Sequence, residues 1–190
     1  MLELVQSLDG ALLLAIQDMR AGFLDPLVET FTQLGNFGIL WIVLSLVLLC
    51  RPRTRRAGVL SLAAMLLGMV CTNVVLKHLV ARPRPWLDVA GLVPLVDEPD
   101  PNSFPSGHTC AAFAAGMVWL RALPGRGGRI LAVVLAVCMG LSRLYVGVHY
   151  PTDVLAGAAV GALCAWIVWR ADGYLRDRKE RLPRKSAGSR

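Results

Sequence analysis

Residues 142–153 gather the side chains of a possible catalytic site into one short stretch between two apolar segments. Arg143 supplies a cation, His149 an imidazole and Asp153 a carboxylate. Ionisable groups at the edge of a membrane segment are energetically unfavourable and mark functional sites by default. A carboxylate beside a histidine fixes the tautomer of the ring, so that the free nitrogen can act as a nucleophile. We therefore expect His149 to lie just before a helix, with Asp153 close enough to orient it.

Two further clusters carry groups that suit phosphate. Lys77 and Arg84 flank the end of an apolar segment, and Ser106, Gly107 and His108 follow a proline at the start of another. Taken singly, each cluster also fits an ordinary role. The first could be a pair of interfacial anchors, the second a helix start, and residues 142–153 a loop with a hydrogen-bonded histidine.

Together, the three clusters match the needs of phosphoryl transfer. Their cations and a helix N-terminus can bind a phosphate group, and a glycine lets backbone N–H groups approach it. His149 can attack the phosphorus atom, while His108 can protonate the oxygen that leaves. No cluster of Asp and Glu suited to magnesium accompanies these residues in the sequence. We therefore expect chemistry without a metal or a cofactor.

The three motifs resemble those of the type-2 phosphatidic acid phosphatase superfamily. They read K-x6-R-P at residues 77–85, P-S-G-H at residues 105–108 and S-R-x5-H-x3-D at residues 142–153, in the family's order. The resemblance implies a metal-independent helical bundle that works through a phosphohistidine. It implies that His149 is the nucleophile, that His108 is the general acid, and that Asp153 supports His149. It implies phosphate binding by Lys77, Arg84, Ser106, Gly107 and Arg143.

Composition places these motifs in a membrane protein. Hydrophobic residues make up 55% of the chain and charged residues 17%, and the mean hydropathy is +0.56. We expect an all-α, polytopic membrane bundle of about five to six spanning helices, with residues 1–20 forming an interfacial amphipathic helix. The spans expected from the apolar runs are residues 26–50, 57–79, 104–123, 130–144 and 152–169. The net charge of +7 lies mainly in clusters beside these runs, which argues against nucleic acid as a partner.

The distribution of basic residues predicts an orientation in the membrane. Arginines near residues 51–56 and 121–129, together with the basic tail, fall on one side when the spans alternate. The positive-inside rule makes that side cytoplasmic, so the site would face the periplasm or outside of the inner (plasma) membrane. We expect residues 1–171 to form the membrane-embedded domain and residues 172–190 a disordered basic cytoplasmic tail.

These expectations lead to a lipid phosphatase whose partners are its lipid phosphate or diphosphate substrate and the surrounding membrane lipids. The small size and outward site are similar to bacterial phosphatases that convert undecaprenyl diphosphate to undecaprenyl phosphate for cell-wall synthesis. Alternatives are a phosphatidylglycerophosphate or phosphatidic acid phosphatase, and a membrane protein that binds phospholipid without hydrolysis. Vanadate-dependent halide oxidation is disfavoured by the hydrophobic chain. Residues 86–102 could border the headgroup entrance, but we favour an ordinary solvated loop.

Overall fold

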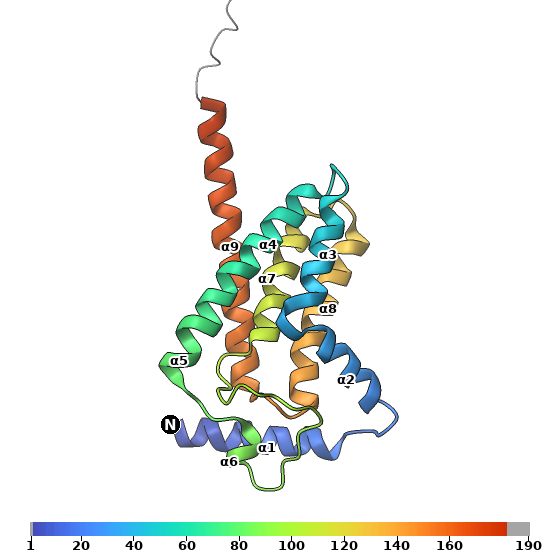
Figure 1. Cartoon of the computed structure of the whole chain (residues 1–190), viewed down its shortest axis with the longest axis vertical. Helices are drawn as coiled ribbons and strands as arrows, with labels where there is room; N and C mark the ends of the chain where they lie inside the picture. The colour runs from blue at the N-terminus through green and yellow to red at the C-terminus, as the bar shows by residue number, and fades with distance from the viewer. Residues whose placement is uncertain (1, 182–190) are drawn as a thin grey trace, which may run out of the picture.

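The computed structural model describes residues 2–181, and its regular elements are helices (Figure 1). Within these residues, the sole β pairing is an isolated bridge between Pro83 and Asn102. The helices are α1 (Leu2–Asp18), α2 (Asp25–Leu34), η1 (Asn36–Gly38), α3 (Ile39–Leu49), α4 (Arg55–Met69), η2 (Val70–Leu76), α5 (Lys77–Val80), α6 (Pro85–Asp88), α7 (Gly107–Ala122), α8 (Arg126–Tyr145) and α9 (Pro151–Arg181). The predicted all-α fold is confirmed.

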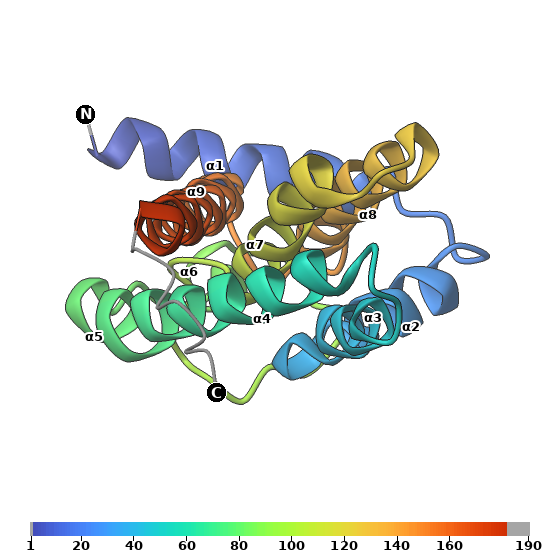
Figure 2. The same cartoon turned by 90° about the horizontal axis from the view of Figure 1, so that it is seen from above.

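Helix α7 lies inside the bundle, where it contacts α4, α8 and α9 (Figure 2). Small residues let its backbone approach that of α9 closely. A Cβ atom on Gly157 would lie 2.4 Å from the carbonyl oxygen of Ser106, and one on Gly161 would lie 2.3 Å from that of Cys110. The backbone N–H of Ser106 donates to the carbonyl of Asp153 at 3.0 Å. This close packing fixes the second motif against the third.

Several helices are long and apolar enough to cross a membrane. They are the continuous segment Arg55–Val80, α8 and α9, and the bent pair of α2 with η1 and α3 makes a fourth if it counts as one span. Helix α7 has 16 residues and runs alongside the others (Figure 1). Large apolar side chains such as Leu66, Val74 and Leu155 are exposed on the surface of the bundle, as in a protein surrounded by lipid. The count of five or more spans stays a prediction.

The first expected span is broken rather than straight. Helices α2 and α3 meet at 54°. Phe37 and Gly38 have positive φ angles of 53° and 72° at the break, and Gly38 supplies the left-handed conformation at no steric cost. The break brings Asn36 to the site described below.

Helix α1 crosses one end of the bundle (Figure 1) and contacts α8 and α9 (Figure 2). Of its own leucines, Leu13 is buried, whereas Leu4, Leu8 and Leu12 are exposed. This placement agrees with an interfacial helix. Asp9 is also buried, although it is charged.

The basic ends of the helices gather at the opposite end of the bundle. The α3–α4 and α7–α8 connections and the end of α9 all lie there (Figure 1). Helix α9 continues to Arg181, so residues 172–181 are helical where we expected a disordered tail. Arg56 binds Asp172 with Nη2 and Oδ2 2.6 Å apart, and its guanidinium lies 4.5 Å from the centre of the Trp169 ring. These contacts hold the extension of α9 against α4, and the remainder of the expected tail lies outside the described residues.

Candidate active site

His149 lies buried in the short connection between α8 and α9. Gly147 makes the turn with a φ of 77°. Nη1 of Arg84 lies 3.1 Å from Nε2 of His149. Because a guanidinium only donates hydrogen bonds, Nε2 accepts this bond, and the proton of the neutral ring is on Nδ1. The lone pair of Nε2 therefore faces a cation that we expect to bind phosphate.

Asp153 lies on the other side of the ring. Its Oδ2 is 3.7 Å from Nδ1 of His149 and accepts a 2.9 Å hydrogen bond from the backbone N–H of Tyr150. The distance of 3.7 Å is longer than a hydrogen bond, so the contact between carboxylate and ring is electrostatic. It favours the tautomer with the proton on Nδ1, the one that the Arg84 contact also requires.

The surroundings of His149 keep its ring neutral. Burial, followed by the positive charges of Arg84, Arg143 and Lys77, holds the pKa of His149 well below its usual range. At pH 7 the ring is therefore unprotonated on Nε2. A neutral imidazole beside fixed cations is suited to attack an anionic phosphate that those cations hold.

Three buried cations from separate elements meet at His149. Lys77 begins α5 directly after the π-helical segment η2, Arg84 precedes α6, and Arg143 is in the last turn of α8. Arg84 also donates from Nη1 to the carbonyl of Val148 at 2.9 Å, and Arg143 donates from Nη1 to Oγ1 of Thr32 at 2.7 Å. Buried guanidinium groups must be paired, so this cluster needs anions.

Carboxylates of the α6–α7 loop, residues 89–106, satisfy that need. Oε2 of Glu98 lies 2.5 Å from Nη2 of Arg143, and Oε1 lies 3.7 Å from Nη2 of Arg84. Asp100 binds Lys77, which lowers the pKa of Asp100 although partial burial opposes the shift. Our expectation of an ordinary solvated loop is therefore wrong, because its acidic run reaches into the cation cluster.

His108 faces the same cluster from the first turn of α7. The ionisable groups that act on it electrostatically are Arg143, His149, Lys77 and Arg84. Nε2 of His108 lies 2.9 Å from Oδ1 of Asn36 at the break between α2 and α3. Because an amide oxygen only accepts, His108 carries a proton on Nε2. Nε2 of His108 is thus an N–H donor, whereas Nε2 of His149 carries a lone pair.

Ser106 and Gly107 occupy the N-terminus of α7. The Ser106 hydroxyl is buried and accepts hydrogen bonds from the backbone N–H and Oγ1 of Thr109, at 3.4 and 2.9 Å. It caps the helix, and its contacts do not include the three cations. A Cβ on Gly107 would lie 3.1 Å from Oδ1 of Asn73, so the helix start approaches η2 closely. Phosphate binding by these two residues stays a prediction.

Comparison with known proteins decides the family. A model of the PAP2 superfamily matches residues 58–177. The chain belongs to the PAP2 superfamily.

Several similar proteins are named as phosphatases that act on lipids. The decaprenylphosphoryl-5-phosphoribose phosphatase of Mycobacterium tuberculosis is 38% identical over 146 residues, which cover 75% of this chain and 78% of the relative. The undecaprenyl-diphosphatase of Sulfolobus acidocaldarius is 35% identical over 127 residues, 67% of this chain and 59% of the relative. The crystal structure of a PAP2-type phosphatidylglycerolphosphate phosphatase from Bacillus subtilis superposes with a TM-score of 0.73 and 32% identity, over 90% of this chain and 87% of that one. This PAP2 chain is a membrane lipid phosphatase, a hydrolase acting on phosphate esters.

Two residues outside the PAP2 motifs, Arg82 and Asp9, were not predicted as site residues, and they contact Asp153 directly or through a partner. Nη1 of Arg82 donates to Oδ1 of Asp153 at 2.8 Å, and Nη2 donates to Oδ2 of Asp9 at 2.9 Å. Hydrogen bonds and charges from Asp9 and Asp153 raise the pKa of Arg82 against the opposing effect of burial. The sequence does single out Asp9, because this acidic residue interrupts the apolar stripe of α1.

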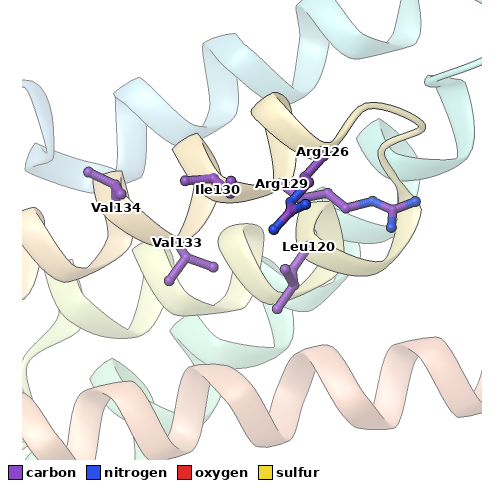
Figure 3. A pocket seen from close by; sticks show the side chains of 6 residues that line it. All are labelled: Leu120, Arg126, Arg129, Ile130, Val133 and Val134. Carbon is purple, nitrogen blue, oxygen red and sulfur yellow. The ribbon is translucent and has the colours of Figure 1, made fainter.

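A hollow at the basic end of this PAP2 bundle carries none of the predicted site residues. It measures about 390 Å³ and is lined by Leu120 of α7 and by five residues of α8 (Figure 3). Ile130, Val133 and Val134 make most of its wall apolar. Its lining residues include none of those that surround His149.

Proposed function

We propose that this chain hydrolyses undecaprenyl diphosphate to undecaprenyl phosphate and orthophosphate through a phosphohistidine at His149. The orientation of the His149 ring is the observation that supports its role as nucleophile. The lone pair of its Nε2 faces Arg84, while its Nδ1 faces Asp153. Two relatives named for polyprenyl lipids support the substrate class. The cell inner membrane is the proposed location.

The proposed reaction has two balanced steps. In the first, the Nε2 lone pair of His149 bonds to the terminal phosphorus and the bridging P–O bond breaks. His108, in its imidazolium form, gives a proton to the leaving oxygen and becomes neutral, so undecaprenyl phosphate departs. In the second, His108 takes a proton from water, the water oxygen bonds to phosphorus and the P–N bond breaks. Orthophosphate leaves and both histidines return to their starting states.

Lys77, Arg84 and Arg143 are proposed to hold the equatorial oxygens of the phosphoryl group. Negative charge develops on those oxygens in the transition state, and fixed donors in a site that excludes water stabilise it strongly. The three side chains are buried and come from α5, the segment before α6, and α8. Since three cations already surround the phosphate, the proposal needs no metal ion and no cofactor.

A monoester substrate is the second candidate. The relative with 38% identity is named for a phosphoribose-linked polyprenyl lipid, and a structural neighbour is named for phosphatidylglycerolphosphate. The same residues would perform the same steps, with an alkoxide in place of the phosphate leaving group. His108 would then matter more, because an alkoxide is a poorer leaving group.

The site is proposed to face the periplasm or outside, with the end of α9 in the cytoplasm. The basic connections and the end of α9 share one end of the bundle, whereas the α8–α9 connection that carries His149 lies at the other (Figure 1). The positive-inside rule assigns the basic end to the cytoplasm. Accessibility of a cysteine placed in the α6–α7 loop to a membrane-impermeant thiol reagent would test this orientation.

The deciding experiment measures phosphate release by the purified protein in detergent with EDTA present. Undecaprenyl diphosphate, phosphatidylglycerophosphate and phosphatidic acid are supplied in parallel. We expect the highest kcat/KM with the diphosphate. Preference for a glycerolipid would replace the substrate proposal, and dependence on added magnesium would refute metal-free catalysis. Binding of all three lipids without release from any would favour the non-hydrolytic alternative.

A further inference from the structure

Asp153 is completely buried, and each oxygen of its carboxylate has its own partners. Oδ2 accepts from the Tyr150 backbone and faces His149, whereas Oδ1 accepts from Nη1 of Arg82 at 2.8 Å. Among the described residues, Arg82 is the one arginine or lysine within ion-pair distance of Asp153. A buried carboxylate retains its charge only when it is paired, so Arg82 is what lets Asp153 act on His149 as an anion.

Arg82 is itself held in place from three directions. Nη2 binds Asp9 on α1, and Nη1 also donates to Oγ1 of Thr152 at 2.7 Å. The guanidinium lies 3.8 Å from the centre of the Tyr150 ring, a distance that suits a cation–π contact. The Thr152 hydroxyl in turn donates to Asp9. Arg82 therefore has one available orientation, set by α1 and by the start of α9.

The phosphate-binding cations belong to a separate cluster. Glu98 and Asp100 pair with Lys77, Arg84 and Arg143, while Arg82 pairs with Asp9 and Asp153. No hydrogen bond or ion pair joins Arg82 or Asp9 to the phosphate cluster within residues 2–181. Within residues 2–181, the ion pairs that lead from Arg82 to His149 therefore run through Asp153.

We propose that Arg82 and Asp9 are positioning residues for the reaction. Asp9 orients Arg82, Arg82 fixes Oδ1 of Asp153, and the remaining oxygen of Asp153 is thereby turned to Nδ1 of His149. Helix α1, which lacks any of the family motifs, is on this basis part of the active site. The inference rests on the proposed role of His149 as nucleophile, but on neither the lipid tail nor the number of phosphates in the substrate.

A purely structural clamp is the competing explanation, and the chain contains one for comparison. Arg56 pairs with Asp172 and covers Trp169 just as Arg82 pairs with Asp153 and covers Tyr150. The Arg56 clamp joins the first turn of α4 to α9 at the basic end of the bundle, opposite the α8–α9 connection that carries His149 (Figure 1). Arg56→Gln therefore removes the same kind of contact without touching the site.

The test uses the full chain in detergent and the lipid that the wild-type protein hydrolyses fastest. The variants are Arg82→Gln, Arg82→Lys, Asp9→Asn, the double variant Arg82→Gln with Asp9→Asn, and Arg56→Gln. Each is assayed for kcat, KM, inhibition by orthophosphate and Tm. Orthophosphate inhibition reports on the phosphate cluster independently of turnover.

We expect Arg82→Gln to lower kcat by about 10- to 100-fold, the range typical of groups that orient a reacting ligand. KM and the inhibition constant of orthophosphate should stay within about threefold, because the phosphate cluster is untouched. Arg82→Lys should recover part of the loss, since one ammonium keeps the charge but cannot bridge two carboxylates. The double variant should be no slower than Arg82→Gln alone, because Asp9 acts through Arg82.

Other results would overturn the inference. Equal loss of kcat in Arg82→Gln and Arg56→Gln, or loss only in proportion to a fall in Tm, would make Arg82 a structural clamp. A rise in KM and in the orthophosphate constant at unchanged kcat would make it a phosphate ligand. If Arg82→Gln does not fold, the Asp9→Asn variant tests the inference. An unchanged kcat in folded Asp9→Asn would refute the role of α1. A different preferred lipid would alter the proposed function and leave this comparison intact.

Discussion

The carboxylate of Glu98 pairs with the buried guanidinium of Arg143, with Oε2 and Nη2 2.5 Å apart. Nη1 of Arg143 is bound to Thr32, and Nε is buried with no hydrogen-bond partner among residues 2–181. A phosphate oxygen that binds at Nη2 of Arg143 therefore competes with the Glu98 carboxylate for this nitrogen. The backbone leaves room for Glu98 to move, because in the described chain residues 96–101 make no backbone–backbone hydrogen bond.

Replacing Glu98 by Gln should strengthen the binding of phosphate-like anions. A neutral amide competes less well for Arg143 than a carboxylate, because charge-assisted hydrogen bonds are about twice as strong as neutral ones. We expect the inhibition constant of orthovanadate, a mimic of pentacoordinate phosphorus, to fall about tenfold, which corresponds to about 1.4 kcal/mol. Asp97→Asn is the matched control, since Asp97 is exposed in the same loop and no ion pair within residues 2–181 joins it to the cations. Weaker inhibition of Glu98→Gln would mean that Glu98 orients Arg143 for the ligand.

Replacing His149 by Gln should abolish phosphate release. The side chain keeps a hydrogen-bonding group near Arg84 but lacks a nucleophilic nitrogen, so we expect a loss of at least about a thousandfold in kcat. His78→Gln is the control, because His78 is exposed and follows Lys77 directly. Rapid acid-free quenching with radiolabelled substrate should trap label on the wild-type protein and on His78→Gln. Label on His149→Gln would show that the nucleophile is another residue.

Replacing His108 by Ala should make the rate depend strongly on the leaving group. A general acid contributes about 10²- to 10⁴-fold when the leaving oxygen needs a proton. We expect a loss of that size with an alkyl phosphate lipid and a much smaller loss with an activated aryl phosphate. A steeper plot of log kcat against leaving-group pKa would verify the role. Parallel losses for both substrates would instead assign His108 to phosphate binding.

The neutral state of His149 should make stability depend on pH in a defined window. Burial and three cations lower the pKa of His149, whereas the unfolded chain has the ordinary value near 6.5. As the pH falls below that value, the unfolded state binds a proton that the folded state does not, so the free energy of unfolding falls by up to about 1.4 kcal/mol per pH unit. His149→Gln should lose less Tm than the wild type between pH 6.5 and 5. Identical slopes would mean that His149 is protonated in the folded protein.

The sequence motifs predicted which residues meet, but not the contacts that hold them. Lys77, Arg84, Arg143, His149 and His108 could be grouped because alternating spans place their loops on one side. Periodicity and hydropathy describe each segment separately, so they carry little information on partners that are distant in the chain.

The residues that escaped prediction illustrate this limit. Glu98 pairs with a residue of α8, Thr32 and Asn36 lie on a span that breaks at a left-handed turn, and Asp9 sits on a helix outside the bundle. Each looks like an ordinary polar residue in its own segment. Its role follows from packing between helices, which the spacing of apolar residues does not specify. The helical structure of residues 172–181 was not predicted for the same reason. It depends on Arg56 of α4, which pairs with Asp172 and lies over Trp169.

The bond between Asp9 and Thr152 joins residues that are 143 positions apart. During synthesis, α1 reaches the membrane surface long before α9 exists, so Asp9 must wait in contact with water or lipid headgroups. Insertion of α9 then delivers Thr152 and Asp153 together to Asp9 and Arg82. The last helix to be made is thus the one that completes the site. A chain that stalls before α9 therefore leaves the pair of Asp9 and Arg82 without the partners that α9 supplies.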